Sequence, residues 1–162
     1  MITPYKLRPI TSSDNSWVCR LLTERWGTPE IITCGLIHQA DQLPGFVAIV
    51  GEEKIGLVTY HVENKACEIV SLDSLGEKTG IGSGLIAAVQ DEAHRAGCHR
   101  LWLITTNDNL PALGFYQKRG FYLVAVHVNA LELSRSLKPT IPLIGLEGIP
   151  VRDEIELEMT LD

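Results

Sequence analysis

One short segment of the chain combines residue types that could bind an anion. Three glycines, Gly80, Gly82 and Gly84, alternate with Ile81 and Ser83 directly before a run with helical apolar spacing. Glycine permits positive φ and lets a ligand approach the backbone closely. The N–H groups at a helix N-terminus then point toward the ligand, where they favour phosphate. The segment therefore predicts a phosphate-binding turn or, alternatively, a helix start that simply needs glycine.

The spacing of these glycines disfavours two common nucleotide sites. A P-loop has Lys and then Ser or Thr after its glycines, whereas Lys78 and Thr79 precede them here. A Rossmann turn requires a third glycine at the position of Leu85. Hydrolysis of nucleoside triphosphates and binding of a nucleotide as a regulator are therefore both disfavoured.

The cysteines and histidines do not form a metal-binding pattern. None of the four cysteines pairs as Cys-x-x-Cys, and the nearest cluster of ligand types is His94, Cys98 and His99, where a helix ends. A structural metal needs ligands at short spacing. We therefore expect no metal, and we expect reduced thiols that fill core or half-buried positions.

Composition limits the class of protein. With 162 residues, of which 45% are hydrophobic and 21% charged, the sequence predicts a single globular domain over residues 1–162. The formal charge of −6 argues against nucleic acid and favours a cationic partner such as an amine. No apolar run approaches the roughly 18 residues of a membrane helix, and residues 1–8 lack a signal-peptide pattern. We expect a cytoplasmic protein that binds no membrane.

Apolar spacing predicts the elements that must position the glycine-rich turn. Helical spacing extends over residues 14–26, 30–39, 84–96 and 109–120, with Asp14 and Asn109 as caps. Alternating spacing predicts strands over residues 46–50, 55–62, 66–72, 100–106 and 121–128, of which the first three form an antiparallel meander. In the strand at 121–128, Tyr122, Val124, Val126 and Val128 are expected on one face.

The end of the chain has one strand and one long connection. Ile155, Leu157, Met159 and Leu161 alternate with acidic residues, which predicts one buried face and one acidic, solvent-exposed face. Before this strand, Ser134 to Asp153 is rich in Pro and Gly and predicts a long irregular connection. Its apolar residues lead us to expect an ordered segment that packs on the sheet edge or on a second subunit and borders the acceptor pocket.

The ordered set of motifs over residues 46–128 resembles the GNAT N-acetyltransferase family. Glu68-Ile69-Val70-Ser71-Leu72 followed by Gly80-Ile81-Gly82-Ser83-Gly84 resembles the acetyl-CoA pyrophosphate loop and the strand before it. The segment from Leu101 to Asn109, followed by Ala112, Phe115-Tyr116 and Gly120-Phe121, resembles the second half of the family's domain. The resemblance implies an α+β (α/β/α) fold, in which a mixed, mostly antiparallel sheet of six to seven strands is flanked by helices.

The same resemblance implies acetyl-CoA as the acyl donor and an amine as the acceptor. It implies a set of residues that bind acetyl-CoA: Leu72, Asp73, Ser74, Thr79, Gly80, Ile81, Gly82, Ser83, Gly84, Asn109, Ala112 and Tyr116. The backbone N–H groups near Leu72 to Ser74 are expected to bind the thioester carbonyl or the pantetheine arm. The acceptor is a small-molecule or peptide amine that the sequence does not identify, and a homodimer is possible.

The resemblance also assigns two catalytic roles. Tyr116 would protonate the leaving thiolate, because a tyrosine pKa near 10 suits donation to a thiolate with a pKa of about 8.5. Glu68 would accept a proton from the amine, with Asp73 and His127 as alternatives. Cys67 adjoins Glu68, but no spacing supports an activated thiol, so direct transfer in a ternary complex is expected.

One residue departs from the family pattern. The family usually has Arg or Gln three residues before the first glycine of its loop, whereas this chain has Glu77 there. Lys78 could compensate for the lost phosphate partner. The departure keeps open an alternative function, a catalytically idle module that binds acyl-CoA or senses it. Trp17, Trp26, Tyr60 and His61 could line the acceptor pocket, although such residues also serve ordinary packing.

Overall fold

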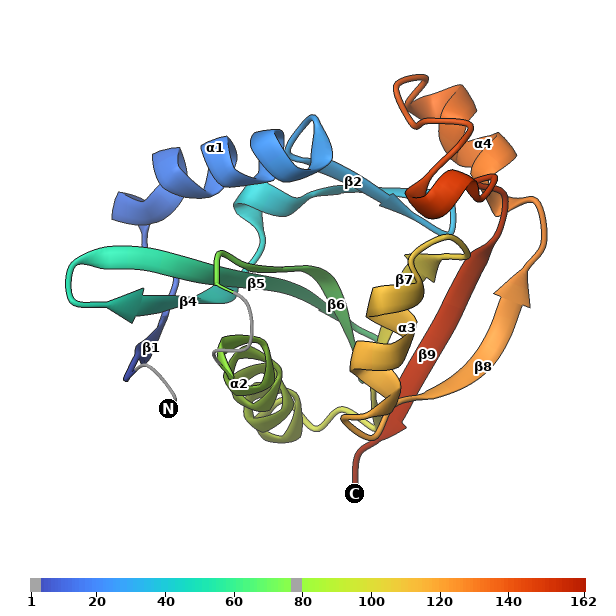
Figure 1. Cartoon of the computed structure of the whole chain (residues 1–162). Helices are drawn as coiled ribbons and strands as arrows, with labels where there is room; N and C mark the ends of the chain where they lie inside the picture. The colour runs from blue at the N-terminus through green and yellow to red at the C-terminus, as the bar shows by residue number, and fades with distance from the viewer. Residues whose placement is uncertain (1–3, 77–79) are drawn as a thin grey trace.

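The computed structural model describes residues 4–76 and 80–162 (Figure 1). Within them, seven strands form one sheet in the order β1-β4-β5-β6-β7-β9-β8, and two strands form a separate hairpin. The large sheet consists of β1 (Lys6–Pro9), β4 (Gly45–Val50), β5 (Glu53–Glu63), β6 (Ala66–Ser74), β7 (Arg100–Thr106), β8 (Tyr122–His127) and β9 (Glu154–Thr160). The hairpin consists of β2 (Glu30–Thr33) and β3 (Leu36–Gln39), and the helices are α1 (Asn15–Trp26), α2 (Ile81–Arg95), α3 (Leu110–Gln117) and α4 (Ala130–Leu137). None of these helices has the length and apolar character needed to cross a membrane.

The predicted mixed sheet is confirmed, and its single parallel pair creates an opening. All neighbouring strands run antiparallel except β6 and β7, which pair only from Ala66 to Ile69 on the β6 side. Beyond Ile69, β6 continues to Ser74 beside β5, while β7 continues to Thr106 beside β9. Among the described residues, no pairing between these strands extends beyond Ile69 and Leu103, so the two strands part near their carboxyl ends.

Two cores lie on opposite faces of the sheet, which confirms the three-layer arrangement (Figure 1). Leu85 of α2 packs with Val58 on one face, which α3 also covers. Leu22 of α1 packs with Val47 on the other, which the hairpin and α4 also cover. These are called the α2 face and the α1 face below. Because both faces are buried, β4 has a continuous apolar sequence from Gly45 to Val50.

A bulge in β6 decides which of its side chains reach each face. The pairing with β5 shifts by one residue and leaves Val70 without a partner position. Strict alternation from Glu68 would put Leu72 and Ser74 on the face of Glu68. The bulge reverses this alternation, so that Leu72 and Ser74 lie on the α2 face while Asp73 joins Glu68 on the α1 face.

A second bulge corrects the prediction for the strand at 121–128. The expected common face of Tyr122, Val124, Val126 and Val128 does not form, because the register shifts and leaves Val124 without a partner position. Tyr122 pairs with a glutamate of β9 and Val126 with an isoleucine, and these two β9 residues point to opposite faces. The same shift turns His127 to the α1 face, where the glutamates of β9 lie.

Residues 30–39 form a hairpin, so the helix predicted there is wrong. Residues 31–33 are all β-branched and therefore favour extended backbone. Cys34 and Gly35 have φ values of 50° and 75°, which suit a two-residue hairpin turn. The helical apolar spacing was misleading because Ile31 is buried against α1 whereas Leu36 is exposed at the edge of the hairpin.

The acidic face of β9 is not solvent-exposed, contrary to the prediction. Glu154 is only 2% exposed and accepts hydrogen bonds from the Cys34 N–H (3.0 Å) and the Ser134 hydroxyl (3.4 Å). Glu156 is half-buried and accepts a hydrogen bond from Arg100 at 2.6 Å. The hairpin and α4 cover these carboxylates, so polar protein groups replace water around them.

The segment predicted as an irregular connection, Ser134 to Asp153, begins within a helix, because α4 ends only at Leu137. The rest of it is joined to the domain by hydrogen bonds from its cations. Arg135 donates to two backbone carbonyls of the connection, and Lys138 donates to the carbonyls of Trp26 (2.9 Å) and Glu30 (3.1 Å). The connection therefore lies against the junction between α1 and β2.

The meander β4–β5–β6, strand β7 and helices α2 and α3 are confirmed. Gly97, with φ 73°, follows the last turn of α2, where a glycine with positive φ commonly ends a helix. Asp14 precedes α1, but its buried carboxylate makes no cap bond to that helix. It accepts instead from the Thr11 N–H (2.8 Å) and forms ion pairs with Arg8 (2.7 Å) and Lys54 (2.9 Å).

Candidate functional site

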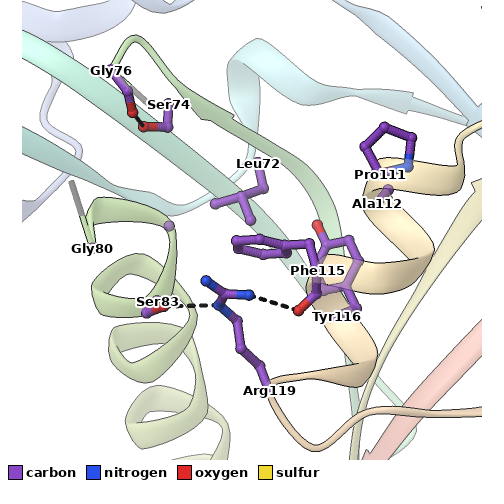
Figure 2. Close-up of a pocket in the computed structure, with 11 residues that line it drawn as sticks. Leu72, Ser74, Gly76, Gly80, Ser83, Pro111, Ala112, Phe115, Tyr116 and Arg119 are labelled. Carbon is purple, nitrogen blue, oxygen red and sulfur yellow. Dashed lines mark hydrogen bonds between the residues drawn. The ribbon is translucent and has the colours of Figure 1, made fainter. Parts of the chain in front are cut away.

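A cavity of about 640 Å³ lies on the α2 face, between β6, the start of α2 and helix α3 (Figure 2). This volume is typical of a small-molecule site. Its lining comes from three elements: Leu72, Ser74 and Gly76 in and after β6; Gly80, Gly82 and Ser83 at the start of α2; Pro111, Ala112, Phe115, Tyr116 and Arg119 in and after α3. Seven of the residues predicted to bind acetyl-CoA are therefore brought together: Leu72, Ser74, Gly80, Gly82, Ser83, Ala112 and Tyr116.

The start of α2 needs its glycines for two physical reasons. Gly80 is the residue before the helix and has φ 77°, a conformation that side chains disfavour. A Cβ on Gly82 would come within 2.9 Å of the Phe115 ring, so glycine lets α3 approach α2. A Cβ on Gly84 would collide with the Tyr5 hydroxyl. First-turn N–H groups of a helix lack intrahelical partners and favour an anion. Thr79 and the two residues before it lie outside the described residues.

Helix α3 places one face of its side chains on the cavity. The Asn109 side chain accepts a hydrogen bond from the Ala112 N–H at 3.2 Å and caps the helix as predicted. Ala112 and Tyr116 are four residues apart and both line the cavity. Asn109 is not among the lining residues, so its role in the structure is to begin the helix.

Tyr116 is a buried residue in the wall of the cavity. Its ring packs edge-on against Phe115 and Phe121, and the residue is 9% exposed. Within the described part of the chain, its hydroxyl has no hydrogen-bond partner, and Figure 2 shows it pointing away from Arg119. Burial, and next the charge of Asp73, raise the pKa of Tyr116, so its proton is held at neutral pH.

Arg119 is a cation of the cavity that the sequence analysis missed. Its Nε donates to the Ser83 hydroxyl at 2.8 Å and its Nη1 to the Phe115 carbonyl at 2.8 Å (Figure 2). The guanidinium lies 3.5 Å from the centre of the Phe115 ring. Its position three residues after Tyr116, on the same side of the helix, is the signal that could have identified it. It adds positive charge beside the N-terminus of α2.

Asp73 lies on the α1 face, between Leu72 and Ser74, which line the cavity on the other face. Its carboxylate accepts a hydrogen bond from the indole N–H of Trp26 at 3.2 Å and the residue is 8% exposed. Burial raises the pKa of Asp73, although the Trp26 hydrogen bond and the charge of Arg25 oppose this shift. The charge of Asp73 also contributes, after burial, to the raised pKa of Tyr116.

Glu68 lies further along the α1 face, beneath the hairpin. It is 3% exposed, accepts a hydrogen bond from Thr33 at 2.8 Å and lies 3.4 Å from the His38 ring nitrogen. It lines a separate cavity of about 220 Å³ together with His61. The third predicted base, His127, hydrogen-bonds Glu156 at 3.0 Å in β9. The structure therefore separates Glu68 and His127 from the cavity of Tyr116.

A third cavity, of about 290 Å³, lies on the α1 face where the connection after α4 meets the α1–β2 junction. Trp26 lines it and also contacts Asp73, and Ile141 and Pro142 of the connection contribute apolar surface. Of the other predicted pocket aromatics, Tyr60 packs on Phe46 in the core. Trp17 packs in the core beneath α1 and below Lys54.

The cysteines close to the site are not activated. Cys67 is fully buried, and burial raises the pKa of its thiol to about 12. Cys98 is also buried, and His94 hydrogen-bonds the Gln90 carbonyl of its own helix at 3.0 Å. Among the described residues, His94, Cys98 and His99 do not bring their ligand atoms together.

Comparison with known proteins places this geometry in a family. The acetyltransferase (GNAT) family model matches residues 14–121. The protein named "Uncharacterized protein YdhI" of Bacillus subtilis (strain 168) is 47% identical over 140 residues, which cover 86% of this chain and 88% of that protein. The solved structure of an IAA acetyltransferase from Bacillus cereus ATCC 14579 aligns with a TM-score of 0.74 at 23% identity, covering 98% of this chain and all of that one. A GNAT acetyltransferase from Elizabethkingia anophelis with acetyl-CoA bound aligns with a TM-score of 0.69 at 21% identity, covering 97% of this chain and 98% of that one. The chain belongs to the GNAT acetyltransferase family.

Proposed function

We propose that the protein transfers an acetyl group from acetyl-CoA to a primary amine by direct attack in a ternary complex. One observation supports this most: the Tyr116 hydroxyl has no protein partner among the described residues and lies in a cavity that opens where β6 and β7 part. A carboxylate, Asp73, lies on the other face of β6, between Leu72 and Ser74, which line this cavity. A proton donor and a proton acceptor would therefore lie on the two faces of the sheet, near the end of the β6–β7 pairing.

Acetyl-CoA would enter from the α2 face. The first-turn N–H groups of α2 and the Arg119 guanidinium would bind its pyrophosphate, since both provide positive charge beside Gly82 and Ser83. Arg119 would supply the side-chain cation that Glu77 does not. The pantetheine arm would lie along β6, whose edge from Val70 to Ser74 makes no pairing with β7. Its amide groups would find backbone donors and acceptors there.

The amine would approach from the α1 face, past Trp26. An ammonium with a pKa near 10 must first lose a proton, and Asp73 would accept it directly or through water. The amine nitrogen then forms the new C–N bond while the C–S bond breaks, and Tyr116 protonates the departing sulfur. Cys67 would take no part, because its thiol is buried with a raised pKa. Glu68 stays the second candidate for the base, acting through the cavity it shares with His61.

The test follows release of free CoA thiol with acetyl-CoA and a panel of primary amines: amino acids, polyamines, aminoglycosides and peptides. We expect acetyl-CoA to raise the melting temperature and one class of amine to release thiol. Stabilisation without turnover on any amine would favour the idle acyl-CoA-binding module. No thermal shift at millimolar acetyl-CoA would contradict both functions.

A further inference from the structure

Three side chains with metal-binding atoms meet on the α1 face, away from the acetyl-CoA cavity. Cys34 lies in the β2–β3 turn, His127 at the end of β8 and Glu156 in β9. The thiol sulfur, a ring nitrogen and a carboxylate oxygen all lie within 4.8 Å of one another. Because the three residues are far apart in the sequence, no local motif predicts this cluster.

Two unusual backbone features bring these ligand types together. Cys34 has φ 50°, in a turn whose next residue, Gly35, is so close to α4 that a Cβ would lie 2.9 Å from Leu133. The bulge at Val124 turns His127 to the face of the β9 glutamates. Without that bulge, alternation would point His127 to the opposite face. Bulges that re-aim a side chain are frequent beside functional sites.

The groups around the cluster have the arrangement of an outer ligand shell. The second oxygen of Glu156 accepts from Arg100 at 2.6 Å, while its first oxygen lies 3.0 Å from His127 Nε2. The Cys34 N–H donates to Glu154 at 3.0 Å, which fixes the turn over the sheet. Ligating carboxylates in metal sites are oriented in this way by second hydrogen bonds.

The local charge balance also favours a cation. Glu154 is 2% exposed and, within the described residues, forms no ion pair; its partners are the neutral N–H of Cys34 and the hydroxyl of Ser134. Burial of an uncompensated carboxylate is costly. Arg100 is shared between Glu156 and Glu158, so it does not neutralise the cluster.

We propose that Cys34, His127 and Glu156 bind a Zn²⁺ ion, with a water molecule completing the tetrahedron at the exposed side of Cys34. Zinc accepts sulfur, nitrogen and oxygen ligands together, at about 2.0 to 2.3 Å. On binding, the Cys34 thiol releases its proton to solvent, and the thiolate and the Glu156 carboxylate balance the two positive charges. The ion joins the tip of the hairpin to the sheet and thereby holds Thr33 and its hydrogen bond to Glu68 in place.

The test uses Co²⁺ as a spectroscopic substitute for Zn²⁺ on the purified, chelator-treated protein. We expect about one equivalent of Co²⁺ to produce a sulfur-to-cobalt charge-transfer absorption, which Zn²⁺ then abolishes by displacement. Cys34→Ser should remove this absorption. The matched control is Cys19→Ser, because Cys19 is a partly buried cysteine of α1 outside the cluster, and this variant should keep the absorption unchanged.

A second variant and a second measurement guard against misfolding of Cys34→Ser. His127→Gln should weaken Co²⁺ binding at least tenfold while circular dichroism shows an unchanged fold. Zn²⁺ should raise the melting temperature of the wild type and of Cys19→Ser, and should not raise that of Cys34→Ser. Absence of the absorption in the wild type, or its persistence in a folded Cys34→Ser or at full affinity in His127→Gln, would overturn the proposal. None of these measurements depends on acetyl transfer.

Discussion

The two faces of the sheet differ in which segments of the chain supply their polar groups. On the α2 face, the cavity is lined by three short stretches of the chain: Leu72 to Gly76, the turn into α2, and one face of α3 from Pro111 to Arg119. On the α1 face, the contacts around the candidate bases and Cys34 join distant segments, such as Trp26 with Asp73, Thr33 with Glu68, and Cys34 with Glu154. Local sequence motifs single out the residues of the first face. On the second face, the contacts join residues that no local motif connects.

This difference separates two kinds of function. Changes on the α2 face should alter binding of acetyl-CoA and protonation of its sulfur. Changes on the α1 face should alter proton removal from the amine and the fit of the amine, while leaving acetyl-CoA affinity unchanged. A variant on the α1 face that changes acetyl-CoA affinity would contradict this division.

The largest expected effect is loss of acetyl-CoA binding in Gly82→Val. The new side chain would meet the Phe115 ring, because even a Cβ lies within 2.9 Å of it, and would fill the cavity beside the start of α2. We expect no rise in melting temperature with acetyl-CoA and no turnover. The control is Gly114→Ala in α3, where a Cβ meets no atom within 4 Å. Its helix should gain about 0.5 to 1 kcal/mol, and normal acetyl-CoA binding is expected. If Gly82→Val still binds acetyl-CoA, the acetyl-CoA site must lie elsewhere in the protein.

The next effect concerns the proton donor. Tyr116→Phe keeps the ring that packs on Phe115 and Phe121 and removes only the hydroxyl. We expect kcat to fall on the order of 100-fold, with little change in the Kd of acetyl-CoA. Tyr122→Phe is the control, because its hydroxyl bonds Thr160 at the exposed edge of the sheet. Near-normal turnover of Tyr116→Phe would show that Tyr116 serves only in packing and does not donate the proton.

The sequence was sufficient for the fold wherever spacing and local turn chemistry agree. The meander, α2 with its stop at Gly97, and α3 with its Asn109 cap follow from such signals. The hairpin over residues 30–39 could not be predicted, because Cys34 is an unusual residue for a positive-φ turn and its apolar neighbours imitate a helix. The bulge that moves Val124 out of register has no local sequence signal, so strict alternation was the default expectation.

The two faces of the candidate site also differ in how far the sequence could predict them. The resemblance to the GNAT family implied one site for the glycines of α2 and Tyr116, and Gly80, Gly82 and Tyr116 line one cavity in the structure. That Asp73 and Glu68 share the α1 face could not be predicted from the sequence, because it depends on the extra residue at Val70, which reverses the alternation of β6. Arg119 was within reach, since it follows Tyr116 by one helical turn.

A smaller effect should decide between the two carboxylates. If Asp73 accepts the proton, Asp73→Asn should lower kcat/KM about tenfold near neutral pH. The deficit should shrink as the pH approaches the amine pKa near 10, where solvent has already deprotonated the amine. In the wild type, activity should rise with pH through the raised pKa of Asp73, since only the ionised carboxylate accepts a proton. Glu68→Gln should show a smaller deficit that is equal at all pH values.

The measurement is a full pH profile of kcat/KM for both variants with one amine. A pH-dependent deficit in Glu68→Gln together with a constant one in Asp73→Asn would reverse the assignment and move the amine to the cavity beneath the hairpin. Both variants should bind acetyl-CoA with unchanged Kd, because neither carboxylate lines the cavity of the α2 face.

The smallest effect concerns the connection that borders the third cavity. Lys138→Met keeps the aliphatic stem and removes an ammonium that donates to the Trp26 and Glu30 carbonyls. We expect about 1 kcal/mol lower stability in urea denaturation, a KM for the amine raised about threefold and an unchanged Kd for acetyl-CoA. Lys118→Met serves as the control, because Lys118 is exposed after α3 and forms no ion pair within the described residues. The carbonyls of Trp26 and Glu30 flank the turn from α1 into β2. Without the Lys138 ammonium, we expect Trp26 to become more mobile and its hydrogen bond to Asp73 to weaken. A Lys138→Met variant that instead weakens acetyl-CoA binding would show that the two faces are not independent.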